Sequence, residues 1–141
     1  MSVVRQAGCV AIGGRGVLIE GKPGSGKSSL ALALIDRGAV LVGDDGVLLD
    51  AAGDGLIAAP HPHTAGKLEV RNVGLIEMPT SPPVAIALVI RLDADAPRFI
   101  EAAELITIEG VALPLVRLYP DSPVLHLRAE LALRTHGLRL S

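Results

Sequence analysis

Residues 19–34 read IEGKPGSGKSSLALAL, in which a glycine-rich loop joins a short apolar run to a run rich in Ala, Leu and Ser. Residues 16–20, before the loop, predict a β-strand, and residues 28–35, after it, predict an α-helix. The loop matches the pattern G-x-x-x-x-G-K-[ST], in which backbone N–H groups cradle phosphates, the lysine reaches the β- and γ-phosphates and the hydroxyl meets Mg²⁺. We therefore predict a phosphate-binding loop (P-loop) made of Gly21, Lys22, Pro23, Gly24, Ser25, Gly26, Lys27, Ser28 and the adjoining Ser29.

A chance match is a poor explanation of this loop. A random chain of the same composition would rarely contain the pattern. The alternative interpretation is an ordinary glycine turn between a strand and a helix. The agreement between the loop and both flanking runs favours the phosphate site.

The composition favours one α/β domain that does not bind nucleic acid. The chain has 141 residues, and we expect residues 1–141 to form a single domain. Half of the residues are hydrophobic, yet Phe99 and Tyr119 are the two aromatic ones, so Ala, Val, Leu and Ile must build the core. Such a core is compatible with a buried parallel sheet covered by helices. The net charge of −2 and the shortage of aromatic rings argue against nucleic acid as a partner.

The single cysteine and the short apolar runs indicate a cytoplasmic protein. Cys9 cannot form a disulfide framework within one chain, so a reducing compartment fits, and we interpret it as a small strand residue. Residues 1–6 cannot supply the apolar core of a signal peptide. No apolar run approaches the length of roughly 18 residues that a membrane span needs, so we expect no membrane association.

Turn residues divide the rest of the chain into further elements. Hairpins are expected at residues 8–20 and 47–59, each around a glycine-rich turn. The helix after the P-loop should end at Arg37-Gly38, because a cation followed by glycine is typical of a helix end. The remaining expectations are a strand over residues 39–43, a buried strand over 84–92, a short helix over 97–105, one or two strands within 106–118, and a helix from Ser122-Pro123 to His136-Gly137.

Two carboxylates follow the strand expected at residues 39–43. A strand, a helix and a second strand in sequence should form a parallel unit, so the carboxyl ends of both strands lie on one edge of the sheet. Asp44 and Asp45 should therefore stand beside the P-loop, where α/β proteins bind ligands. Phosphoryl transfer needs Mg²⁺ and a proton acceptor, and this pair can serve both needs. The alternative is a solvated acidic turn.

Two stretches of the sequence resemble those of a known protein family. Residues 21–45 (GKPGSGKSSLALALIDRGAVLVGDD) and 68–77 (LEVRNVGLIE) resemble the catalytic domain of HPr kinase/phosphorylase, the bacterial enzyme that phosphorylates a serine of the phosphocarrier protein HPr. The second stretch resembles the family's signature, and the likeness runs from about Val3 to Val111. The resemblance implies an α/β fold with a P-loop kinase-like mixed sheet, flanking helices and β-hairpins, similar also to phosphoenolpyruvate carboxykinase. It further implies a short form without the family's N-terminal domain.

The resemblance assigns roles to four residues and implies ATP and Mg²⁺ as cofactors. Lys27 matches the P-loop lysine, and Ser28 and Glu69 match the Mg²⁺ ligands. Asp45 matches the carboxylate that acts as base in the kinase direction and as acid in the reverse direction. HPr is the implied partner. Full-length members of the family assemble as rings of six, and the resemblance leaves open whether this chain forms a homo-oligomer.

Three more positions are assigned through the same resemblance. Asp44 matches the acidic residue beside the catalytic carboxylate. Arg71 lies inside the signature, and Arg98 matches the family's catalytic arginine. An arginine suits charge that develops on transferring oxygens, but the alternative for both is a surface ion pair.

The sequence departs from the family at two places. Gln6 occupies the position of a family histidine, and glutamine cannot carry a titrating proton near neutrality. The stretch that longer members use for dephosphorylation is missing after Gly110, so we expect kinase rather than phosphorylase activity. We interpret the four histidines as a solvated loop pair and two structural helix residues: His61, His63, His126 and His136.

Three functions are compatible with these observations. The leading one is an ATP- and Mg²⁺-dependent serine kinase that acts on HPr. The second is a P-loop kinase for another substrate. The third is a nucleotide-binding regulatory module that transfers nothing, an interpretation that Gln6 leaves open.

Overall fold

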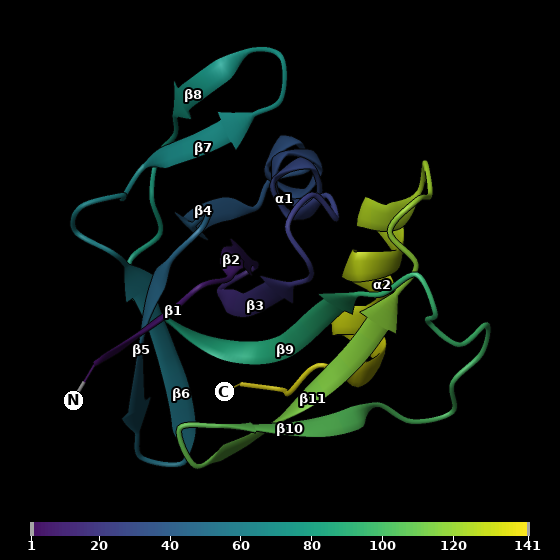
Figure 1. Ribbon diagram of the computed structural model, residues 1–141. Coiled ribbons are helices and arrows are strands. Elements are labelled where there is room, and N and C mark those ends of the chain that lie inside the picture. The colour runs from purple at the N-terminus through teal and green to yellow at the C-terminus, as the bar shows by residue number, and fades with distance from the viewer. Residues whose placement is uncertain (1, 141) are drawn as a thin grey trace.

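The computed structural model describes residues 2–140 and has a mixed α/β architecture (Figure 1). Its elements in chain order are β1 (Val3–Arg5), β2 (Gly8–Ile12), β3 (Arg15–Glu20), α1 (Lys27–Asp36), β4 (Val40–Gly43), β5 (Val47–Ala52), β6 (Gly55–Pro60), β7 (Lys67–Val70), β8 (Gly74–Glu77), β9 (Val84–Leu92), β10 (Glu104–Ile108), β11 (Val111–Leu118) and α2 (Leu125–His136). Nine of the described strands form one curled sheet, and β7 pairs with β8 in a separate hairpin.

The sheet is built around β9, the long apolar strand expected from the sequence. One edge of β9 pairs in parallel with β3. The other edge pairs with β6 near its start and in parallel with β11 near its end. The parallel strands β3, β9 and β11 therefore bring their carboxyl ends together on one rim of the sheet.

The P-loop unit has the expected direction but not the expected neighbours. Both β3 and β4 pair with β2 in antiparallel fashion, so β3 and β4 run parallel to each other with β2 between them. The carboxyl ends of β3 and β4 thus face the same rim. The predicted juxtaposition of the P-loop with residues 44–45 is confirmed, because Ser28 and Asp44 are hydrogen-bonded.

The two faces of the sheet are covered differently. Helices α1 and α2 pack on one face through aliphatic residues such as Leu34 and Leu133. The opposite face has no helix among the described elements; β5, β6, β10 and β11 curl over it and bury Cys9, Leu18 and Val89. Aliphatic residues fill both clusters, as the shortage of aromatic residues predicts. Among the described elements, helices cover one of the two faces of the sheet.

Most expected elements are present, and one is not. The hairpins β2–β3 and β5–β6 and the end of α1 before Gly38 match the expectations. The helix expected over residues 97–105 is wrong: residues 93–103 are irregular, and Glu104–Ile108 pairs with β11. An isolated helix of nine residues is only marginally stable in water. Residues 104–108 therefore form a strand instead, because β11 offers unpaired backbone groups at its edge.

The last helix begins later than expected. Its first residue is Leu125 and its N-cap is Val124, whereas the Ser122 hydroxyl accepts a hydrogen bond from the Val124 N–H at 3.2 Å. The helix ends at His136 as expected. Within residues 2–140, neither helix is long and apolar enough to cross a membrane.

Candidate active site

The P-loop joins the end of β3 to the start of α1 in a conformation that needs glycine. Gly24 and Gly26 have φ angles of 80° and 102°, which side-chain-bearing residues rarely adopt. Gly21 is required for space, because an added Cβ would collide with Ser25 Oγ and lie 3.2 Å from the Leu92 Cβ. The loop therefore passes close to the end of β9.

The first turn of α1 offers free donors to an anion. Gly26 caps the helix without a side-chain hydrogen bond, and no acidic residue lies in the first turn. The first N–H groups of a helix have no partner within it and carry partial positive charge. Uncapped donors beneath a glycine loop form a site for phosphate.

The Lys27 ammonium is held at the mouth of the loop. Its Nζ donates to the carbonyl oxygens of Gly21 at 3.0 Å and Lys22 at 3.2 Å. An ammonium has three donors, so one remains for a ligand.

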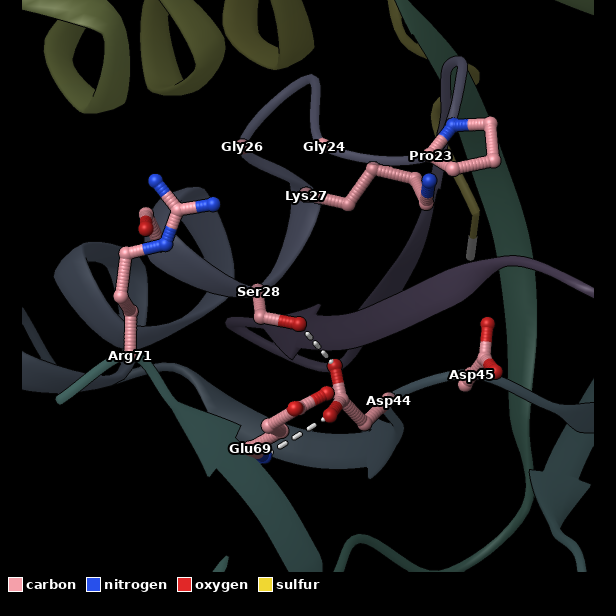
Figure 2. Close-up of a pocket in the computed structure, with 10 residues that line it drawn as sticks. Pro23, Gly24, Gly26, Lys27, Ser28, Asp44, Asp45, Glu69 and Arg71 are labelled. Atoms are coloured by element: carbon pink, nitrogen blue, oxygen red, sulfur yellow. Dashed lines mark hydrogen bonds between the residues drawn. The ribbon is translucent and has the colours of Figure 1, made fainter. Parts of the chain in front are cut away.

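Asp44 connects the P-loop helix to the β7–β8 hairpin. Its Oδ1 accepts a hydrogen bond from the Ser28 hydroxyl at 2.6 Å, and its Oδ2 accepts one from the Glu69 backbone N–H at 2.9 Å (Figure 2). Asp45 stands apart from this group, is exposed, and makes no side-chain hydrogen bond with any described residue. The two neighbouring carboxylates therefore have different surroundings.

A cavity of about 340 Å³, called here the phosphate cavity, collects most of the predicted residues. It is lined by Pro23, Gly24, Gly26, Lys27, Ser28, Ser29, Asp44, Asp45, Glu69 and Arg71. Arg71 forms no ion pair with the described residues, contrary to the structural alternative considered from the sequence. Most of the predicted P-loop residues thus share one cavity with the acidic pair and with two residues of the signature stretch.

The side-chain oxygens of the phosphate cavity can bind Mg²⁺ only together with phosphate oxygens of a ligand. Among residues 2–140, no group of three or more His, Cys, Asp and Glu side chains is arranged to hold a metal. Mg²⁺ characteristically uses one or two protein carboxylates together with substrate phosphates and water. The hydroxyl of Ser28 and the carboxylates of Asp44 and Glu69 match that requirement.

Several predicted residues lie outside the phosphate cavity. Gly21, Lys22 and Ser25 line a second cavity on the other side of the P-loop, and Gln6 also lines it. Arg98 is exposed in the segment 93–103 and lines neither cavity. The structure does not bring Arg98 to the P-loop.

None of the four histidines lines either cavity. His61 and His63 lie in a turn with ring centroids 5.4 Å apart, and the His63 N–H donates to His61 Nδ1 at 3.2 Å. His126 and His136 belong to α2. None of them is placed to act for the missing family histidine.

The second cavity was not predicted from the sequence. It is bordered by two groups of ion pairs: Arg5 and Arg91 with Glu20, and Arg117 with Asp93 and Glu104. The backbone N–H of Asp95, and then the Arg117 guanidinium, hold the pKa of Asp93 below its ordinary value. The sequence did not predict this cluster, because its residues lie far apart in the chain and meet only when the strands pair.

Comparison with known proteins identifies the family. The family model described as HPr Serine kinase C-terminal domain matches residues 2–93, about two thirds of the chain. The chain belongs to this family. The match ends earlier than the likeness expected up to Val111, and it includes the P-loop, the acidic pair and the signature stretch.

Individual members of the HPr serine kinase family show the same relationship. The HPr kinase/phosphorylase of Clostridium tetani is 46% identical over 67 residues, which are 48% of this chain and 22% of that protein. The enzyme of the same name from Chlorobium phaeobacteroides is 32% identical over 123 residues, which are 78% of this chain and 36% of that protein. The chain thus aligns with about a fifth to a third of these relatives.

A solved structure confirms the fold of the family. The HPr(Ser) kinase/phosphatase from Coxiella burnetii superposes with a TM-score of 0.83 and 28% sequence identity. The superposition covers 94% of this chain and 88% of that one. The α/β fold with a mixed sheet, flanking helices and hairpins is that of the family's catalytic domain.

Proposed function

We propose that this chain catalyses ATP- and Mg²⁺-dependent phosphorylation of a serine in the phosphocarrier protein HPr. The observation that carries the proposal is that the P-loop, Asp44 and Asp45 line one cavity, with the Ser28 hydroxyl bonded to Asp44 at 2.6 Å. Family membership supports a kinase, and the names of the matched relatives support HPr as substrate.

The phosphates would lie against the P-loop and the start of α1. The free helix N–H groups and the remaining donor of Lys27 would bind their oxygens. Ser28 and Glu69 would hold Mg²⁺, which supplies charge neutralisation between the β- and γ-phosphates when bound. The Ser28 hydroxyl can donate its proton to Asp44 while its lone pairs stay available for the metal.

Asp45 would act as general base. Its carboxylate has no hydrogen-bond partner among the described residues and faces the same cavity, so it is available to an entering serine. As the serine oxygen attacks the γ-phosphorus, Asp45 takes the hydroxyl proton and the bond from that phosphorus to the bridging oxygen breaks. The products are ADP and phosphoserine.

Arg71 would stabilise negative charge on the transferring group. Its unpaired guanidinium lines the phosphate cavity, and such a donor acts strongly where charge develops. The catalytic role expected for Arg98 stays a prediction, because Arg98 lines neither of the two cavities. Assembly of several copies likewise stays a prediction.

Mass spectrometry of HPr tests the proposal. Purified HPr is incubated with the protein, ATP and Mg²⁺, and with the Asp45→Asn variant as the matched comparison. We expect one phosphoryl group on a serine of HPr with the wild type, and at least about a hundredfold less with the variant, because a base contributes roughly 10²–10⁴ in rate. ATP should bind both proteins.

Two outcomes would favour the other functions. Phosphorylation of a different protein in cell extract, with none on HPr, would indicate a kinase for another substrate. Nucleotide binding without any ADP or phosphoprotein would indicate the regulatory module that Gln6 left open.

A further inference from the structure

Glu20 is the last residue of β3 and directly precedes the P-loop. On one side of β3, the ladder with β9 continues as far as the pair of Glu20 with Arg91. On the other side, the ladder with β2 ends one residue earlier, where Ile19 pairs with Gly8. Backbone pairing therefore holds this end of β3 on one side, at the point where the chain leaves the sheet.

The Glu20 side chain adds a contact on each side through two arginines. Its Oε1 accepts a hydrogen bond from Arg91 at 3.0 Å, and its Oε2 accepts one from Arg5 Nε at 2.7 Å. Arg91 lies on the paired strand β9, whereas Arg5 belongs to β1, which pairs with β5 and not with β3. The Glu20 side chain is 12% exposed. Charge-assisted hydrogen bonds to both oxygens fix the position and the orientation of this carboxylate.

The backbone just beyond Glu20 holds the Lys27 ammonium. The Gly21 carbonyl oxygen accepts a hydrogen bond from Lys27 Nζ at 3.0 Å. Gly21 lies close to β9, since an added Cβ would be 3.2 Å from the Leu92 Cβ, and Leu92 follows Arg91 directly. A displacement of the end of β3 would therefore move the Gly21 carbonyl and, through it, the ammonium.

The charge of Glu20 by itself would oppose phosphate binding. A carboxylate beside a phosphate-binding loop repels an anionic ligand, so its removal should strengthen binding if charge alone mattered. A partly buried ion pair is also weak evidence for a gain in stability. A benefit of Glu20 to the site must therefore come from geometry, which gives the experiment below a definite sign.

We propose that Glu20 is a positioning residue for Lys27. Its carboxylate, held by Arg5 and Arg91, fixes the end of β3 and thereby the Gly21 carbonyl that orients the ammonium. This role rests on the proposed function, because it takes from it the binding of phosphates by Lys27. Glu20 acts through the backbone and through Lys27, and it lines the second cavity rather than the phosphate cavity.

Selective acetylation tests the placement of Lys27 without any ligand. Wild type and variants are treated with limiting acetic anhydride, and peptide mass spectrometry gives the rate at Lys27 relative to Lys67, an exposed residue of β7. The hydrogen bonds of the Lys27 ammonium must break before the amine reacts. The variant is Glu20→Gln, and its matched control is Glu130→Gln, which removes the 2.7 Å ion pair between Arg37 and Glu130. Circular dichroism checks that both variants fold.

We expect the relative acetylation of Lys27 to rise severalfold in Glu20→Gln and to stay unchanged in Glu130→Gln. Calorimetry with magnesium ADP should show binding about fivefold weaker in Glu20→Gln, the size of one lost hydrogen bond. Glu130→Gln should bind ADP as the wild type does, since an ion pair away from the P-loop contributes little. Arg5→Gln leaves the pair of Glu20 with Arg91 in place and should produce the same changes to a smaller degree.

Unchanged acetylation of Lys27, or unchanged or tighter ADP binding, in folded Glu20→Gln would overturn the proposal. If Glu20→Gln does not fold, the same results in Arg5→Gln would overturn it. Failure of the wild type to bind magnesium ADP would instead contradict the proposed function and, with it, the contribution of Glu20 to phosphate binding.

Discussion

Asp44 and Asp45 are adjacent in sequence but differ in what they contact. Asp44 accepts two hydrogen bonds that connect Ser28 in α1 to Glu69 in β7, whereas Asp45 accepts none from the described residues. The sequence predicted both as acidic residues beside the P-loop, but it could not show which of them is tied to its neighbours. That distinction depends on the position of β7, which is distant in the chain.

The difference predicts that truncating the two carboxylates lowers stability by unequal amounts. Asp44→Ala should lower the free energy of unfolding by about 2 kcal/mol, since hydrogen bonds to a charged acceptor are lost. Asp45→Ala should lower it by less than about 0.5 kcal/mol, since its side chain is exposed and unbonded. Urea denaturation with an unchanged m-value measures both. Equal losses would show that the Asp44 contacts do not hold the hairpin to the P-loop.

At the scale of elements, the β7–β8 hairpin is a small unit that carries Glu69 and Arg71 into the site. It forms a separate two-stranded sheet and projects from the main body (Figure 1). A two-stranded hairpin is marginally stable by itself, so its contact with the core must fix it. Leu68 is fully buried in the cluster beneath α1, whereas Leu75 is 62% exposed.

Leu68→Ala should therefore loosen the hairpin. We expect a loss of about 2–5 kcal/mol of stability, faster amide exchange over residues 67–77, and weaker Mg²⁺-dependent nucleotide binding. Leu75→Ala serves as the control and should change stability by less than about 0.5 kcal/mol. Amide exchange measured by mass spectrometry would contradict this account if both variants behaved alike.

Arg117 joins the ends of three strands near the second cavity. It lies on β11 and pairs with Asp93, just after β9, and with Glu104 at the start of β10. Hydrogen bonds from the Asp95 N–H and Arg117 lower the pKa of Asp93 from its ordinary 3.8. A carboxyl group whose pKa is lower in the folded state stabilises the fold above its ordinary pKa, and this effect is lost as pH falls through the folded value.

Asp93→Asn should consequently be less stable than the wild type at about pH 7, and the difference should shrink as the pH falls below about 3.8. Thermal unfolding of both proteins across this range is the measurement. A difference that stayed constant with pH would mean that the charge of Asp93 is not responsible.

On the scale of the whole molecule, local signals predicted the elements better than their arrangement. The glycine turns, the P-loop unit and the apolar run of β9 are encoded over a few residues, and all were identified from the sequence. The curled second face, the pairing of β10 with β11 and the second cavity depend on residues far apart in the chain. The helix expected over residues 97–105 failed for the same reason.

Ligand binding should stabilise the molecule as a whole. A hundredfold excess of magnesium nucleotide over its Kd adds about 2.7 kcal/mol to the folded state, which for this chain length raises Tm by roughly 5–10 °C. Lys27→Ala should abolish the shift because it removes the ammonium at the P-loop mouth. Mg²⁺ alone should produce little change, and an equal shift with Mg²⁺ alone would contradict binding through phosphates.

The most direct test is a crystal structure of the protein with Mg²⁺ and a non-hydrolysable ATP analogue. We expect the β- and γ-phosphates to lie on the P-loop and the metal to contact Ser28. The Asp45 carboxylate should lie on the side of the γ-phosphorus where a serine hydroxyl would enter, within roughly 3 Å of the position of that hydroxyl. Phosphates bound away from residues 21–28, or an Asp45 carboxylate on the far side of the fold from the γ-phosphate, would contradict this account.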